Sequence, residues 1–205
     1  MPDALTNVRA PAVVRARRLL QGKFRHQEGL FLAEGPQACR EAARYAVVRT
    51  LFATPAAAAR YDDIVAAVQL RGGDIVLCDD RVIESLGDAV SPQGIVACVQ
   101  YPTHSVSAAV HSGSRLVVLL ASVRDPGNAG AVVRAADAVG ADGVIVTTES
   151  VDMGNPKVVR SSAGSLFHLP VIEHVNLLEV IADARACGMQ ILAAELAVGL
   201  PQLLK

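Results

Sequence analysis

The chain has 205 residues, of which 52% are apolar and 3% aromatic, and its formal net charge is −1. This length fits one large or two small domains, and an aliphatic core suits parallel strands that helices cover on both faces. Four scattered cysteines without a C-x-x-C pair, and histidines without ligand spacing, argue against a disulfide framework or a metal site. No apolar run approaches the ~18 residues that a membrane span needs, so we expect a cytoplasmic protein without a membrane or metal partner.

The first part of the chain, residues 1–101, is predicted to alternate helices and strands. It opens with a basic amphipathic helix over 12–20 and a polar turn over 23–28. The further elements that we predict are strands at 30–33, 47–53, 75–77 and 94–100, helices at 35–44 and 81–87, and an alanine-rich helix broken near Pro55. Such alternation indicates an α/β sandwich with a mostly parallel sheet.

Positive charge is concentrated at this end. Residues 1–49 hold nine Arg or Lys and four Asp or Glu, a net of +5, whereas residues 106–205 have a net charge of −2. A basic end on a neutral body suits a polyanion that is held at one place. A solvated helix face explains these charges equally well.

A polar linker over 102–114, with the capacity for one helical turn, leads into the second part, residues 115–205. Its predicted strands are 116–120, 143–146, 169–172 and 190–194, and its predicted helices are 128–139, 156–167 and 177–187. This order of elements requires right-handed crossovers and a parallel sheet.

The segment DPGNAGAVVRAADAVG, residues 125–140, combines a strand-to-helix turn with unusual polar residues. Pro126 and Gly127 favour the turn, and Asn128 is a candidate cap for the helix that follows. Arg134 is the residue that packing alone does not require. Without further information, a surface pair between Arg134 and Asp137 at i,i+3 explains it best.

The spacing N-x-G-x-x-x-R of Asn128, Gly130 and Arg134 resembles the first signature motif of the SpoU family. These are S-adenosyl-L-methionine (AdoMet)-dependent RNA ribose 2′-O-methyltransferases of the SPOUT class. Three further stretches resemble the family in the same order, namely GLFLAEG (29–35), SPQGIVACV (91–99) and NPKVVRSSAGSLFHLP (155–170). The resemblance therefore extends over nearly the whole chain.

The resemblance implies an α/β fold with two domains. The N-terminal one would be a ribosomal-protein-like α/β RNA-recognition domain, and the second a SPOUT-type parallel α/β domain of the trefoil-knot family. The family's later N-E-G-x-G and S-L-N motifs have no counterpart here. We therefore expect a truncated SPOUT domain that lacks its C-terminal part and most of the AdoMet pocket.

The resemblance also implies that Arg134 is the family's essential arginine and that Asn128 positions it. Arginine is a poor general base, because its pKa exceeds ~12. We therefore expect Arg134 to bind the target phosphate or to stabilise the forming alkoxide, and proton removal by Arg134 is the second choice. Gly127 and Gly130 are expected to allow the backbone to approach RNA closely.

Two groups of cations and one segment complete the expected site. The cations expected to bind RNA are Arg15, Arg17, Arg18, Lys23 and Arg25 near the start, and Lys157 and Arg160 on a later helix. Ala194, Glu195 and Leu196 follow the predicted strand 190–194 at its carboxyl end, where ligands of open α/β sheets bind, so we expect cofactor contact there. A helix-capping role for Glu195 is the alternative.

The function predicted from the sequence is AdoMet-dependent ribose 2′-O-methylation of ribosomal or transfer RNA by a homodimer. The alternative is a non-catalytic RNA-binding protein that has lost the cofactor pocket. A nucleotide-dependent α/β enzyme is disfavoured, because the chain has no phosphate-binding loop.

Overall fold

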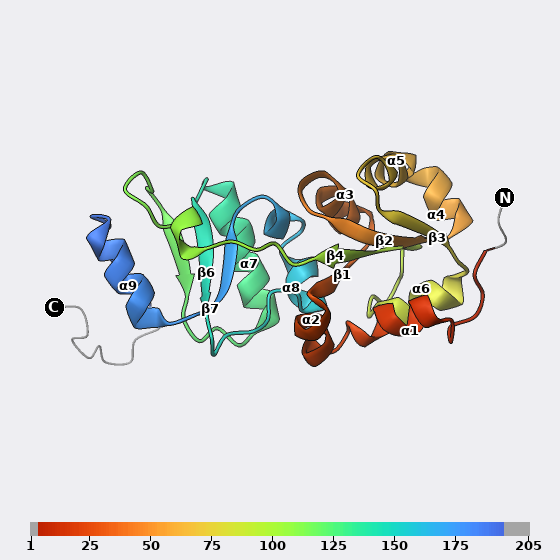
Figure 1. Ribbon diagram of the computed structural model, residues 1–205, viewed down its shortest axis with the longest axis horizontal. Helices are drawn as coiled ribbons and strands as arrows, with labels where there is room; N and C mark the ends of the chain where they lie inside the picture. Colours follow the sequence, from red (N-terminus) through yellow and green to blue (C-terminus); the bar gives the residue numbers. More distant parts are fainter. Residues whose placement is uncertain (1–3, 195–205) are drawn as a thin grey trace.

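A computed structural model describes residues 4–194 of the chain. They form two units, each built around its own sheet, which lie side by side along the long axis of the molecule (Figure 1). Within the described residues, no helix is both long and apolar enough to cross a membrane.

The N-terminal unit contains a mixed sheet of four strands. Their order is β1 (Leu30–Glu34), β4 (Ile95–Gln100), β2 (Val48–Ala53) and β3 (Asp74–Leu77). β4 lies between β1 and β2 and runs antiparallel to both, and only β2 and β3 pair in parallel. The expectation of a mostly parallel sheet is therefore wrong here, because the last strand enters the middle of the sheet in the opposite direction.

Helices cover both faces of this sheet (Figure 1). They are α1 (Pro11–Arg18), α2 (Gly22–Glu28), α3 (Pro36–Tyr45), α4 (Pro55–Arg60), α5 (Asp62–Leu70) and α6 (Asp80–Leu86). Successive strand residues point to opposite faces. On β1, Leu32 packs in the cluster of α1 and α6, whereas Phe31 and Ala33 belong to the cluster of α3 and α5.

Residues 22–28 form helix α2 and not the polar turn predicted for 23–28. The helix ends at Gly29, which adopts the left-handed conformation (φ 65°) that favours glycine. The helix has few apolar residues, and its buried residue is Arg25. Because the buried position of α2 is occupied by an arginine, the segment shows no apolar periodicity, and the helix could not be predicted from it.

The C-terminal unit contains a parallel sheet of three strands in the order β5 (Val117–Leu120), β6 (Gly143–Thr147) and β7 (Val171–Val175). Its parallel direction and its first two strands confirm the prediction, and β7 begins two residues later than predicted. The predicted strand 190–194 is wrong, since these residues have no strand conformation. An apolar run becomes a strand only when a neighbour supplies hydrogen-bond partners, and no strand of the described part of the chain pairs with them.

Three α-helices and two 3-10 turns surround this sheet: α7 (Pro126–Ala138), α8 (Pro156–Ser161), α9 (Leu177–Ala186), η1 (Val106–Ala108) and η2 (Ser165–Phe167). α7 and α8 pack on the face toward the N-terminal unit, and α9 on the opposite face (Figure 1). The predicted helix 156–167 is interrupted because Ala163 and Gly164 both take positive φ values (52° and 100°).

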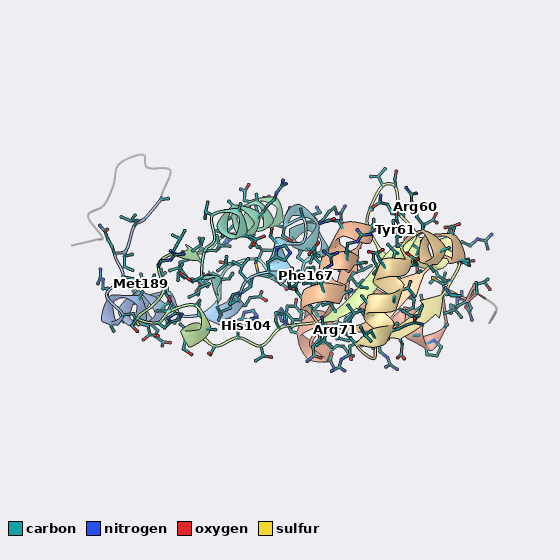
Figure 2. The ribbon with its side chains drawn as sticks, turned by 90° about the horizontal axis from the view of Figure 1, so that it is seen from above. Arg60, Tyr61, Arg71, His104, Phe167 and Met189 are labelled. Atoms are coloured by element: carbon teal, nitrogen blue, oxygen red, sulfur yellow. The ribbon has the colours of Figure 1, made fainter. Side chains whose placement is uncertain are left out.

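The apolar core continues from one unit into the other. Phe31 of β1 and Phe167 of η2 stack with nearly parallel rings, 6.1 Å apart. Phe167 lies at the junction, while His104 marks the segment that connects the two sheets (Figure 2). The junction is thus a packed interface in addition to a chain connection.

The four cysteines are free. Cys39, Cys78 and Cys98 are buried, and burial raises the pKa of the Cys78 and Cys98 thiols to about 12. Cys187, next to the end of α9, is partly exposed.

Candidate active site and RNA interface

The N-terminus of α7 follows the carboxyl end of β5 and is capped by Asp125. The Asp125 Oδ1 atom accepts a hydrogen bond of 2.7 Å from the Asn128 N–H. The cap is therefore Asp125 and not the predicted Asn128. Within the described residues the Asn128 side chain makes no hydrogen bond, and the residue is exposed. Its amide is thus free to contact a ligand or to orient a neighbouring group.

Gly130 faces α8 and does not line an RNA surface. A Cβ atom at this position would lie 2.0 Å from Ser161 Oγ and 2.6 Å from the carbonyl oxygen of Val158. The expectation that this glycine allows RNA to approach is wrong, because the residue is buried between two helices. Its role in the N-x-G-x-x-x-R spacing is to let α7 and α8 pack closely.

Arg134 lies two turns into α7 and is exposed. The surface pair with Asp137 does not form: Asp137 Oδ2 instead lies 2.7 Å from His168 Nδ1. No ion pair within residues 4–194 involves Arg134. Long helical side chains lean over the preceding turn of their helix, which directs Arg134 toward residues 130–131, the turn that follows Asn128.

His168 connects the two units through its imidazole ring. In addition to Asp137, it contacts Glu41 of α3, with 3.0 Å between Nε2 and Oε2. Burial lowers the pKa of His168, but the hydrogen bonds to the two carboxylates outweigh burial and raise it overall. The pair Asp137–His168 therefore belongs to the junction, which leaves Arg134 available.

α8 supplies two further cations. Asn155 caps this helix by accepting a hydrogen bond of 3.0 Å from the Lys157 N–H. Lys157 is exposed at the first turn, and Arg160 forms an ion pair with Asp88 of the N-terminal unit. Of the two predicted RNA contacts on α8, Lys157 is thus open to solvent, whereas Arg160 has a partner.

The cations predicted in the basic N-terminal segment divide into two environments. Arg15, Arg17 and Arg18 on α1 and Lys23 on α2 are exposed, and the Arg18 guanidinium lies over the Phe24 ring at 3.9 Å. Arg25 is only 4% exposed. Its burial removes Arg25 from the surface that RNA can reach.

Arg25 is instead the centre of a polar cluster at the junction. Its Nε donates to Asp152 Oδ2 at 2.7 Å, and its Nη1 donates to the carbonyl oxygens of Leu19 and Leu20 at 3.0 Å. The Tyr101 hydroxyl donates to Asp152 Oδ1 at 2.5 Å. Asp152 therefore joins the start of the connecting segment to both units.

Glu173 of β7 lies beside this cluster and accepts a hydrogen bond of 2.8 Å from the Met153 N–H. Burial, reinforced by the negative charge of Asp152, raises the pKa of Glu173 to about 7. Sequence reasoning missed Asp152 and Glu173, because neither belongs to a motif and their burial depends on contacts between the two units.

The expected cofactor contacts lie at the edge of the described structure. Ala194 is exposed and belongs to no strand, while Glu195 and Leu196 lie outside the described residues. The residues present do not fit AdoMet at this position, because 190–194 offer no strand edge and line neither the small pocket beside Phe31 and Tyr101 nor the cleft between Glu34 and Arg160. Among residues 4–194, no group of three or more His, Cys, Asp or Glu side chains could hold a metal ion.

Two family models match the chain. Residues 10–97 match the MRM3-like substrate binding domain, and residues 115–201 match the SpoU rRNA Methylase family. The two matches cover the N-terminal unit and the C-terminal unit respectively, so the unit that contains Arg134 is the one that matches the methylase.

Individual proteins give the same assignment. An uncharacterized tRNA/rRNA methyltransferase of Synechocystis is 29% identical over 93% of the chain, which spans 69% of that relative. A 23S rRNA (uridine(2479)-2′-O)-methyltransferase of Streptomyces viridochromogenes is 35% identical over 60% of the chain, which spans 44% of the relative. The chain thus spans from less than half to about two thirds of these proteins.

Solved structures share the fold. An rRNA methyltransferase from Sinorhizobium meliloti superposes with a TM-score of 0.83 at 29% identity, over 97% of this chain and 74% of the other. An AdoMet-bound rRNA methyltransferase structure from the same organism gives a TM-score of 0.79 at 29% identity, over 90% of this chain and 69% of the other.

Proposed function

We propose that this chain, which belongs to the SpoU rRNA methylase family and has an MRM3-like substrate-binding domain, methylates a ribose 2′-hydroxyl of ribosomal RNA, or of transfer RNA, with AdoMet. Residues 1–101 hold the RNA, residues 102–114 are the linker, and residues 115–205 provide the methyltransferase part. The site of action is the cytoplasm.

The observation that carries this proposal is the state of Arg134. It is an exposed arginine in the part of the chain that matches the methylase, it has no ion-pair partner in the described structure, and its helix is anchored through Gly130. An arginine side chain offers five N–H donors and a permanent charge, which suits phosphate or a developing alkoxide. Asn128, whose amide is also free, lies six residues earlier, about 9 Å along the helix axis.

Methyl transfer to a ribose is an in-line displacement that requires the 2′-oxygen to be held near attack distance. Arg134 stabilises the oxygen as it gains negative charge, or fixes the adjoining phosphate, because guanidinium cannot accept the proton at neutral pH. Asn128 orients the guanidinium or the ribose through its free amide. AdoMet supplies the methyl group, and we assign none of the described residues to hold it.

The exposed cations of α1 and α2 bind the RNA backbone together with Lys157. Contacts to phosphates are independent of sequence and position the substrate. The protein acts as a homodimer, as the family resemblance implies.

The test is Arg134→Ala in a protein extended to the full length of its relatives, measured by transfer of labelled methyl groups from AdoMet to rRNA. We expect turnover to fall by about 10²- to 10³-fold, while RNA affinity stays within about threefold. Arg185→Ala, which removes an exposed arginine of α9, serves as the matched control and is expected to keep normal turnover. Unchanged turnover in Arg134→Ala disproves the catalytic assignment.

A non-catalytic RNA-binding protein is the second candidate, and the absence of a strand at 190–194 favours it. Calorimetry of the 205-residue chain with AdoMet separates the two functions. RNA binding without AdoMet binding indicates the second candidate, unless a chain extended to the length of its relatives also binds AdoMet.

A further inference from the structure

A cleft of about 250 Å³ lies between the two units, away from the Arg25 cluster. Glu34, Gln37, Ala89 and Gln93 line it from the N-terminal unit, and Val159 and Arg160 line it from α8. By the same measure a single water molecule needs only about 10–15 Å³, so the cleft can hold a much larger ligand. Its walls combine small apolar side chains with a carboxylate, two amides and a guanidinium.

The carboxylate of Glu34 has almost none of its hydrogen-bonding capacity used. Oε1 is buried and has no partner within the described structure. Oε2 accepts a single long bond of 3.3 Å from the Asp88 N–H. An ionised carboxylate can accept about four hydrogen bonds, and a buried oxygen without a donor is costly, so a donor from outside the chain is expected here.

The segment that closes the cleft contains no helix or strand. It runs from Gly87 to Gly94, and the Glu34 carboxylate lies directly against Gly87, where a Cβ would be 2.2 Å from Oε1. The next residue of this segment, Asp88, forms with Arg160 the ion pair that crosses between the units. Loops of this kind can shift to admit a ligand. When the ion pair with Asp88 breaks, the Arg160 guanidinium can bind an anionic or carbonyl group of that ligand instead.

We propose that this cleft binds a guanine base of single-stranded RNA, with the Glu34 carboxylate accepting hydrogen bonds from the N1–H and the N2 amino group. This inference rests on the proposed function, because RNA is the polyanion that such a protein handles. Binding requires the segment 87–94 to move away from the Glu34 carboxylate, whose Oε1 is covered beside Gly87. The base edge then takes the place of the Asp88 N–H at one carboxylate oxygen and supplies the missing donor at the other.

The chemistry of the wall selects guanine among the four bases. Its Watson–Crick edge is the one that presents two adjacent N–H donors, which match the two acceptor oxygens of a carboxylate. Uracil places carbonyl oxygens on both sides of its single N–H, and these would be repelled by the carboxylate. The guanine O6 finds donors in the Gln93 amide or the Arg160 guanidinium, both at the cleft wall. Unstacked bases of single-stranded RNA are commonly recognised on this edge.

Labelled uridine pentamers whose central base is guanine, hypoxanthine, adenine or uracil test the proposal by their affinity for the 205-residue chain. Hypoxanthine is guanine without the N2 amino group. We expect the guanine pentamer to bind roughly tenfold more tightly than the other three. In Glu34→Gln this preference falls to within about twofold, because an amide cannot accept both N–H groups.

A second variant addresses the chance that Glu34→Gln disturbs the loop at Asp88. Ala89→Trp fills the cleft and keeps the carboxylate, and it is expected to remove the guanine preference as well. Glu179→Gln, which makes the same chemical change on exposed α9, is the control and keeps the preference.

Equal affinity for the four pentamers, or a guanine preference that survives in both Glu34→Gln and Ala89→Trp, overturns the proposal and leaves water as the partner of Glu34. The pentamer test requires neither AdoMet nor turnover. A chain that methylates rRNA without a guanine preference therefore disproves the cleft proposal alone, and a guanine preference without methylation disproves the proposed function alone.

Discussion

The junction between the two units and the outer face of α1 hold arginines from the same stretch of chain in opposite surroundings. At the junction, Arg25 is desolvated and all its assigned partners belong to the protein. On α1, Arg15 and Arg17 face water. A buried charge must be compensated within the protein, whereas an exposed charge remains available to an outside anion. The comparison separates an arginine that stabilises the fold from arginines that can bind RNA.

Breaking the junction is expected to have the largest effect. Asp152→Ala removes the carboxylate that compensates Arg25 and also accepts the Tyr101 hydroxyl. We expect the free energy of unfolding to fall by about 3–5 kcal/mol, measured by urea denaturation, because a buried guanidinium is left unpaired.

Asp63→Ala provides the exposed counterpart, since it breaks the ion pair between Arg40 and the half-exposed Asp63. The expected loss there is at most about 1 kcal/mol. Equal losses in the two variants would show that the junction pair is no more stabilising than a surface pair.

The second prediction concerns pH and Glu173. The pKa of Glu173 is raised from 4.5 to about 7 in the folded protein. Between these two pH values the folded state keeps a proton that the unfolded state has lost, so stability falls as pH rises across this window, by up to about 3 kcal/mol. Glu173→Gln removes this contribution while its amide oxygen can still accept the Met153 N–H.

The measurement is the difference in unfolding free energy between Glu173→Gln and the unchanged protein from pH 4.5 to 8. We expect the variant to gain relative stability as pH rises to about 7 and then to hold a constant advantage. The difference cancels other titrations such as that of His168, whose raised pKa also makes stability fall as pH rises above 6.5. A flat difference would contradict the burial of an ionisable carboxyl at this position.

The smallest effect on folding is expected on α1. Replacing Arg15, Arg17 and Arg18 with Ala should change the free energy of unfolding by no more than about 0.5 kcal/mol. RNA binding should weaken, and the slope of log affinity against log salt should become shallower by about 2, because each phosphate contact contributes about 0.7 to 0.9. Replacement of Arg44, Arg60 and Arg185 is the matched control, and equal slopes in both variants would mean that the α1 cations are only solvated.

Local patterns predicted the elements better than their pairing. Short continuous apolar runs identify β5 and β6 correctly, and the turn chemistry after β5 identifies α7. The antiparallel entry of β4 and the missing strand at 190–194 depend on neighbours that are distant in sequence, which periodicity does not report.

The residues of the candidate site also divide into those that a local motif marks and those that depend on contacts distant in sequence. Arg134 and Asn128 are recognisable because a motif spacing marks them, and the structure adds that their side chains are free. Arg25 and Glu34 show the limit, since their sequence neighbours are ordinary and only the folded structure shows that the Arg25 side chain and the Glu34 Oε1 atom are buried. A basic segment of a sequence indicates a polyanion site only after the buried cations, such as Arg25, have been excluded from it.

The distribution of the four thiols makes Cys187 a site for selective chemical labelling. A thiolate is the form that reacts with maleimides and disulfides, and burial with a raised pKa keeps Cys39, Cys78 and Cys98 out of that form. Cys187 is the remaining cysteine, and it is partly exposed in the unit that holds Arg134. A fluorophore can therefore be placed on the unaltered chain at one known position, remote in sequence from the α1 cations, and its signal would report RNA binding or subunit association without any substitution.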